Sequence, residues 1–157
     1  MLQRPQSVLL LLTAICMVLY LATPPVWHKV GTGEEAILTP YYMAHMKGTL
    51  AAVNRPVFYL AILAVLSAGV SVFTIFQYKN RVRQMMFVAL NSLIGAALLG
   101  TTVYHIQFEA TRFFNPDQQG EFGIGFWAAF AALVFNWISN RLIRRDERKV
   151  RDADRMR

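Results

Sequence analysis

The chain has 157 residues, of which 55% are apolar and 16% charged, and its formal net charge is +7. Soluble domains carry about 25% charged residues, so this deficit means long uncharged stretches. The composition excludes a disordered chain, a secreted disulfide scaffold and a freely soluble nucleic-acid binder. The single cysteine, Cys16, cannot form an internal disulfide, and we interpret it as a buried residue of a membrane helix.

Four uncharged apolar stretches are each about twenty residues long, enough to cross a hydrocarbon core of about 30 Å as helices. The first ends at Pro24-Pro25, because proline cannot continue a helix. Arg4 before a leucine run is typical of a signal peptide, but prolines directly follow the small-residue site, so we expect a retained helix. The predicted spans are residues 7–23, 57–78, 85–104 and 122–139.

The distribution of cations predicts the orientation. Only residues 79–84 separate the second and third spans, so these helices are expected to be antiparallel neighbours. Of the 16 Lys and Arg residues, 12 lie before the first span, in this short loop or in residues 140–157. Because cationic segments resist translocation, we predict both termini inside, with loops 24–56 and 105–121 outside. The inner segments then carry +8 and the outer loops −1.

The outer loops show patterns of their own. Residues 104–111 alternate apolar and polar side chains, which predicts a strand. Residues 27–30 and 36–42, the latter interrupted at Pro40, supply possible partner strands. We therefore expect a small outer sheet that rests on the bundle. Residues 42–53 fit a short amphipathic helix.

Hydrocarbon gives a helix no hydrophobic reason to leave lipid for another helix, so close backbone approach and polar contacts must hold the bundle together. Ser92, Ala96 and Gly100 have a spacing of four, a small-residue stripe that we expect to face a neighbour. Asn91 and Asn136 fall at similar depth in the third and fourth spans. We predict that these two amides hydrogen-bond to each other, directly or through a water. This interaction should stabilise the bundle by on the order of 1 kcal/mol.

Residues that carry chemistry are sparse. No Asp, Glu, Lys or Arg lies within the four spans, where a transporter or proton relay places one. Thiol oxidation needs paired cysteines, and a bis-histidine haem site needs histidines inside the bundle. His28, His45 and His105 form a metal site only if the two outer loops converge, and we interpret them as surface histidines. We therefore predict no catalytic residue, no cofactor and no metal site.

Residues 140–157 form a basic tail. No helix breaker follows Ser139, so the tail is expected to continue the fourth helix into the cytoplasm. We interpret it as an anchor near anionic lipid headgroups, with a gain of about 1 kcal/mol per nearby cation, and docking of a protein is the alternative. Four acids within the tail weigh against nucleic acid as a partner. The cations assigned to headgroups or to a partner are Arg141, Arg144, Arg145, Arg148, Lys149 and Arg151.

Both ends of the chain resemble a family of small four-span bacterial inner-membrane proteins catalogued as a domain of unknown function. The matching segments are the opening MLQRPQSVLLLLTA and the closing residues Asn140-Arg141, Arg144-Arg145-Asp146-Glu147 and Asp152-Ala153-Asp154-Arg155-Met156-Arg157. The resemblance implies the four-span topology and a bacterial cytoplasmic membrane, and it supplies no catalytic residue. It also suggests that Gln3-Arg4 and the end of the tail meet on the inner side.

The expected fold is an all-α membrane protein: a four-transmembrane-helix bundle with a small extracytoplasmic β element and a cytoplasmic helical tail. Two functions stay open. The first, which we favour, is a non-catalytic accessory or scaffold subunit that binds a membrane-protein partner or a second copy. The second is a small lipid- or quinone-interacting enzyme or carrier, which needs a cavity lined by Asn91, Asn136, Ser71 or Thr74.

Overall fold

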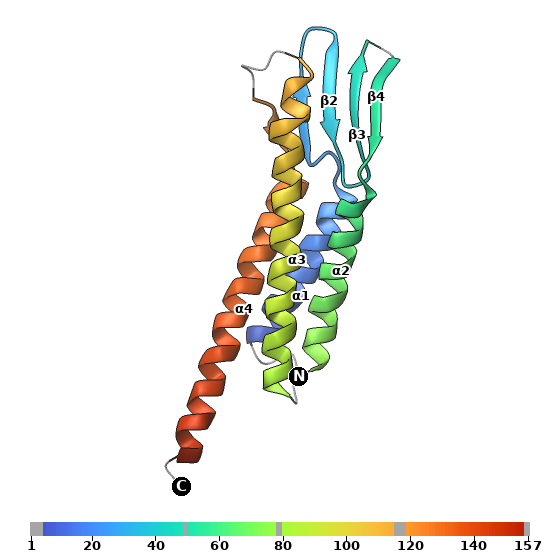
Figure 1. Cartoon of the computed structure of the whole chain (residues 1–157). Helices are drawn as coiled ribbons and strands as arrows, with labels where there is room; N and C mark the ends of the chain where they lie inside the picture. Colours follow the sequence, from blue (N-terminus) through green and yellow to red (C-terminus); the bar gives the residue numbers. More distant parts are fainter. Residues whose placement is uncertain (1–4, 49, 78–79, 115–118, 156–157) are drawn as a thin grey trace.

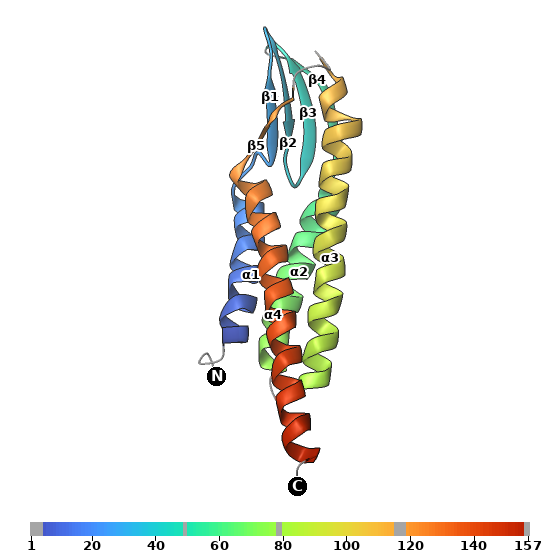
Figure 2. The same ribbon diagram turned by 90° about the vertical axis from the view of Figure 1, so that its left-hand side faces the viewer.

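Four helices form an elongated bundle, and a five-stranded sheet lies at one end of it (Figure 1). The computed structural model describes residues 5–48, 50–77, 80–114 and 119–155. We call the end that carries the sheet the sheet end. The opposite end, beyond which the last helix projects, is the tail end (Figure 2).

All four helices are long and apolar enough to cross a membrane. Each packs against two others: α1 lies between α2 and α4, and α3 completes the bundle by contacting the same two helices. The fourth helix runs without interruption into the basic tail, as the absence of a breaker predicts. The helices are α1 (Pro5–Ala22), α2 (Phe58–Phe76), α3 (Arg81–Phe108) and α4 (Ile124–Arg155).

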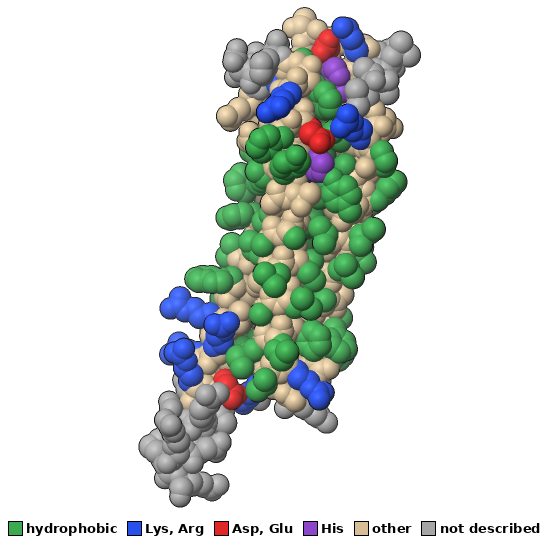
Figure 3. Space-filling model, in the orientation of Figure 1, with side chains coloured by type: hydrophobic (Ala, Val, Ile, Leu, Met, Phe, Trp, Pro, Cys, Tyr) green, Lys and Arg blue, Asp and Glu red, His purple; other side chains and the backbone are tan. Residues whose placement is uncertain are grey.

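Apolar side chains cover the outer surface of the bundle on the face that Figure 3 shows. Val18, Ile62 and Leu93 are each more than half exposed, although they lie within three different helices. Charged side chains gather at the two ends (Figure 3). A helix surface that is apolar all round is what hydrocarbon requires, and the chain thus has the architecture of a multi-pass membrane protein.

The third helix is longer than predicted at both ends. It begins at Arg81, where the Asn80 side chain accepts a hydrogen bond from the Arg83 N–H at 3.2 Å and so caps the first turn. At its other end the predicted strand over residues 104–111 is wrong, because α3 continues to Phe108 and a 3-10 turn, η1 (Ala110–Arg112), follows. The alternation was misleading: Tyr104 and Phe108 stack on the exposed side of a helix, one turn apart.

The predicted helix over residues 42–53 is also wrong, because this segment forms a hairpin. Gly48 has a φ of +63°, which suits a residue without a side chain and lets the chain reverse there. Four strands follow one another as an antiparallel meander, and a short fifth strand pairs with the first from far along the chain. They are β1 (Trp27–Val30), β2 (Glu34–Leu38), β3 (Tyr42–Lys47), β4 (Leu50–Pro56) and β5 (Glu121–Phe122), in the order β4-β3-β2-β1-β5.

One hydrophobic core extends from the bundle into the sheet. Tyr20 of α1, Trp27 of β1 and Leu98 of α3 are all buried within it. A second, smaller core at the tail end contains Leu10 and Ile143. The sheet is therefore part of the same folded unit as the helices, because their apolar side chains share one interior.

Strand β5 leads into α4 through Gly123, which lies against the end of α1. A Cβ atom at this position would come within 2.1 Å of the carbonyl oxygen of Pro25. The Gly123 N–H also donates to the carbonyl of Val26 at 2.9 Å. The absence of a side chain here lets two backbone segments meet, and the contact sets where α4 enters the bundle.

We predict that Gly123→Ala lowers the stability of the protein by about 1–3 kcal/mol, because the new methyl group has to displace backbone. Gly100→Ala is the matched control, since a Cβ there meets nothing within 4 Å. Thermal unfolding in detergent, followed by circular dichroism, measures both. Equal midpoints for the two variants would contradict the close approach.

Candidate functional site

All three histidines lie at the sheet end, and each is paired with a glutamate. His45 Nε2 lies 3.2 Å from Glu34 Oε2, and His105 Nδ1 lies 3.1 Å from Glu109 Oε2. His28 is 3.7 Å from Glu121. The outer loops thus converge, and only 11% of each of the His45 and His105 side chains is exposed, so they are not the surface residues that we expected.

These carboxylate pairs do not assemble into a metal centre. Among the described residues, no group of three or more His, Cys, Asp or Glu side chains is placed to hold a metal ion. Each imidazole instead binds its own carboxylate, which fixes the orientation of the ring.

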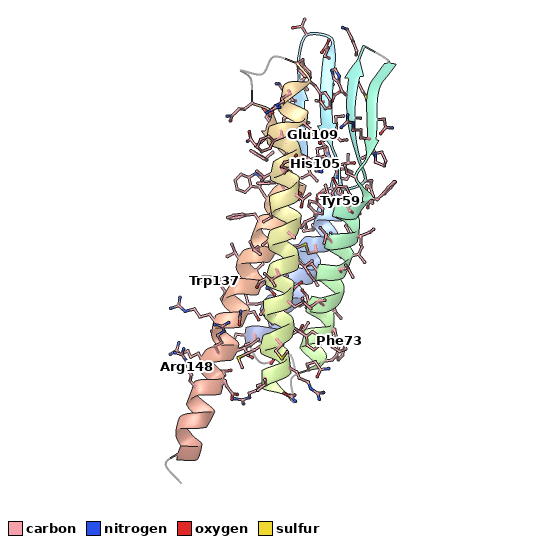
Figure 4. The ribbon with its side chains drawn as sticks, viewed as in Figure 1. Tyr59, Phe73, His105, Glu109, Trp137 and Arg148 are labelled. Atoms are coloured by element: carbon pink, nitrogen blue, oxygen red, sulfur yellow. The ribbon has the colours of Figure 1, made fainter. Side chains whose placement is uncertain are left out.

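A polar chain of three residues joins α2 to α3 at the sheet end (Figure 4). His105 and Glu109 are four residues apart and share one helix face, so the ring nitrogen reaches the carboxylate. The other ring nitrogen, Nε2, contacts the Tyr59 hydroxyl. In the tautomer in which Nδ1–H donates to Glu109, Nε2 accepts a hydrogen bond from the Tyr59 hydroxyl, and the three side chains join the sheet ends of α2 and α3.

A buried lysine ties the end of α3 to the sheet. Lys29 is only 3% exposed, and its Nζ donates to the carbonyl oxygens of Thr111 at 3.3 Å and Phe114 at 2.6 Å. His45 stacks on Phe113 with the ring centroids 5.0 Å apart. Carbonyl dipoles thus replace the water that the ammonium group loses on burial, and the segment after α3 is held on the sheet. Sequence reasoning missed this contact, because 82 residues separate Lys29 from Thr111.

Glu34 lies between two basic side chains. The ammonium group of Lys47, at 3.3 Å, lowers the pKa of the Glu34 carboxyl below its usual value of 4.5, and the hydrogen bond from His45 acts in the same direction. Partial desolvation of the carboxyl opposes this shift, but it is weaker than the effect of Lys47. Ionised Glu34 thus joins β2 to β3, since both partners come from β3.

Within the helices, Asn91 and Asn136 meet. Asn91 Nδ2 donates to Asn136 Oδ1 at 3.1 Å and to Ser71 Oγ at 2.8 Å. Asn136 Nδ2 donates to Ser92 Oγ at 2.8 Å and to the Val88 carbonyl at 3.0 Å. This amide network links α2, α3 and α4, and both amides are at most 2% exposed.

The small-residue stripe is only partly right. Ser92 belongs to the network, but Ala96 and Gly100 are exposed on the outer surface of α3. The glycine that faces a neighbour is Gly95, where a Cβ would lie 3.1 Å from the Leu133 side chain. The buried face of α3 follows Asn91, Gly95 and Leu98, so the stripe was displaced by about one residue around the helix.

Three buried side-chain atoms have no hydrogen-bond partner among the described residues: His28 Nδ1 at the sheet end, and Asn91 Oδ1 and Ser67 Oγ within the helices. The remaining polar atoms of the amide network bind one another. Asn91, Asn136 and Ser71, which the alternative function places around a cavity, are thus linked to one another by hydrogen bonds.

At the tail end the described cations line the exposed part of α4. Gln6 of α1 contacts Asp146, and Arg81 Nη1 donates to the Asp146 carbonyl at 3.3 Å. The start of α1 thus contacts α4 at Asp146, while α4 continues beyond this contact to Arg155. The expected contact between Gln3-Arg4 and the end of the tail is not tested, because Gln3-Arg4 lies outside the described residues. Lys149 and Arg151 belong to the helical backbone of α4, and their side chains are not described. The exposed cations of α4 whose side chains are described are Arg141, Arg144, Arg145 and Arg148, and Arg83 of α3 is exposed at the same end.

We predict that Asn91 and Asn136 stabilise the bundle jointly. A double-mutant cycle with Asn91→Leu and Asn136→Leu should give a coupling free energy of about 1 kcal/mol, measured by unfolding in detergent. Each single variant leaves a buried amide without its partner. The loss of unfolding free energy in each single variant should therefore be more than half of the loss in the double variant. Strict additivity of the two changes would show that the amides act independently.

Acid should weaken the sheet through Glu34. Because the folded-state pKa is lowered, ionised Glu34 contributes stability above its ordinary pKa of 4.5, and this contribution disappears as the pH falls below that value and through the folded-state pKa. Glu34→Gln should therefore flatten the pH dependence of the thermal midpoint in this range. Glu35→Gln, on the opposite face of β2, is the control and should retain the wild-type profile. Identical profiles for wild type and Glu34→Gln would exclude this role.

The comparison with family models identifies the chain's relatives. One model, described as a domain of unknown function, DUF4293, matches residues 2–156. No curated protein matches the chain. The family match agrees with the resemblance of the two chain ends and covers all four helices and the sheet. The chain therefore belongs to the DUF4293 family.

Proposed function

We propose that this protein is a non-catalytic scaffold subunit of a larger membrane assembly. In this proposal it lies in a bacterial cytoplasmic membrane, with both termini in the cytoplasm and the sheet outside. The separation of charge supports the orientation: the tail end carries four exposed arginines of α4, whereas the sheet end carries the three histidines and their glutamates.

The observation that carries the proposal is a rigidly held sheet with one open face. The covered face contains the directly opposed residues Trp27, Leu38 and Met43, each at most 1% exposed. The opposite face, which we call the open face, contains the row of His28, Ile37, Ala44 and Asn54, because residues directly opposite on paired strands share a face. Within this row Ala44 is only 2% exposed, so its larger neighbours form the surface. No described helix lies over this face (Figure 2).

The open face has the composition of a small contact surface. Val30 is 66% exposed, and Glu35 and Met46 lie directly opposite it across β2 and β3. Glu35 thus lies between two apolar side chains, and such a mixture of apolar and charged groups is compatible with a surface that another protein covers. The Lys29 contacts and the shared core prevent the sheet from moving relative to the bundle, which suits a fixed docking platform.

The alternative, a lipid- or quinone-interacting enzyme or carrier, has less support. It needs an internal cavity at the level of Asn91 and Asn136, and there the amide network occupies the interior. Tyr59, His105 and Glu109 hold one another in place, and their contacts are explained by closure of the bundle.

The test is purification of the tagged full chain from its native membrane in a mild detergent, with mass spectrometry of the proteins recovered. We expect one membrane-protein partner in constant ratio. Val30→Lys should reduce its recovery about 10-fold or more, equivalent to about 1.4 kcal/mol, because a charge replaces the most exposed apolar side chain of β1 on the open face. Thr32→Lys adds the same charge at the exposed β1–β2 turn and should leave recovery unchanged.

Two results would contradict the scaffold role. One is recovery of the chain alone, as a particle of one copy with lipid. The other is equal recovery of the partner with both lysine variants, which would place the contact away from the open face.

A further inference from the structure

A groove runs along the outer surface of the α3–α4 pair toward the tail end. Its upper part has a volume of about 580 Å³, and the lower part adds about 390 Å³. Ala89 and Arg144 border both parts, so the two parts are continuous. The groove exists because Ala89 and Ser92 are small, while Leu93 and Met86 beside them are large.

The groove is apolar toward the middle of the bundle and cationic toward the tail end. Its apolar walls are Leu93 of α3 and Trp137 of α4. Arg141 and Arg144 line the same upper part, and Arg148 lines the lower part. Positions 137, 141, 144 and 148 are three or four residues apart and share one face of α4. Trp137 and Arg148 both point away from the bundle on this side (Figure 4).

Two contacts hold the upper arginines at the groove. The guanidinium of Arg141 lies over the Trp137 ring, 6.0 Å from its centroid. Arg144 Nε donates to Asn140 Oδ1 at 3.2 Å. This last bond uses one of the five N–H groups of Arg144 and leaves the forked end of the guanidinium free to receive a second acceptor.

We propose that this groove binds one anionic phospholipid. The phosphodiester binds between Arg141 and Arg144, and an acyl chain lies along Ala89 and Leu93. Arginine favours phosphate because its parallel N–H groups match two phosphate oxygens, and tryptophan is favoured at the depth of lipid headgroups. The proposal rests on the membrane location and is independent of any protein partner on the sheet.

The charges around the groove select the class of lipid. Residues 140–148 contain four arginines against Asp146 and Glu147. A zwitterionic lipid brings an ammonium group next to its phosphate, and the arginines repel it. A glycerol headgroup brings no cation, so phosphatidylglycerol fits better than phosphatidylcholine. Glu147 borders only the lower part, away from Arg141.

The experiment is native mass spectrometry of the full chain in detergent, with added dioleoylphosphatidylglycerol or dioleoylphosphatidylcholine. We expect one retained phosphatidylglycerol per chain and at least a tenfold preference over phosphatidylcholine. The double variant Arg141→Gln/Arg144→Gln should retain both lipids equally. Ala89→Phe, which fills the apolar part without a change of charge, should also lose phosphatidylglycerol.

The matched control is Arg83→Gln/Arg145→Gln, which removes two exposed cations at the same end that do not line the groove. It should keep the wild-type preference. Equal loss in this control would overturn the proposal in favour of diffuse attraction, as would equal retention of the two lipids by the wild-type chain. Displacement of the lipid by glycerol 3-phosphate at equal concentration would show that the groove takes no acyl chain. Circular dichroism shows which variants are folded. If only one of the two groove variants, Arg141→Gln/Arg144→Gln or Ala89→Phe, is folded, its lipid preference alone tests the proposal.

Discussion

The bundle depends on one constraint: a polar group inside it must find its partner inside it, because hydrocarbon offers none. Asn91 and Asn136 meet this constraint by bonding to each other and to serines on α2 and α3. The amide network lies between the large core of the sheet end and the small core around Leu10. It therefore sets the register of three helices at a level where apolar contacts alone allow sliding.

At the sheet end this constraint is weaker, because a polar group outside the hydrocarbon can also bind water. Carboxylates can pair with histidines one at a time, and Lys29 can be buried because two carbonyls receive it. These contacts attach the segment after α3 to the sheet, while Gly123 brings the start of α4 against the end of α1. The position of the sheet thus depends on three parts of the chain: the segment after α3, the start of α4 and the end of α1.

Periodicity in the sequence predicts some of this well and some of it badly. The helices were visible because hydropathy over twenty residues is a strong signal, and β1 was visible from its turn. The end of α3 was misread because Tyr104 and Phe108 are apolar and exposed, which imitates strand alternation. The hairpin over residues 42–56 was missed because its two faces do not divide into apolar and polar ones. Ala44 and Met46 lie on the open face, whereas His45 and Lys47 lie on the covered face, so no clear period of two appears.

By itself the sequence determined the four apolar helices, the charge difference between the two ends, and the similar depth of Asn91 and Asn136, since these are properties of composition and spacing along one helix at a time. Only the tertiary structure decided which face of α3 is inside, that every histidine meets a glutamate, and that Trp137 and three arginines border one groove. The physical reason is that these features are contacts between elements distant in the chain. Their geometry depends on helix rotation and strand register, which local sequence leaves open.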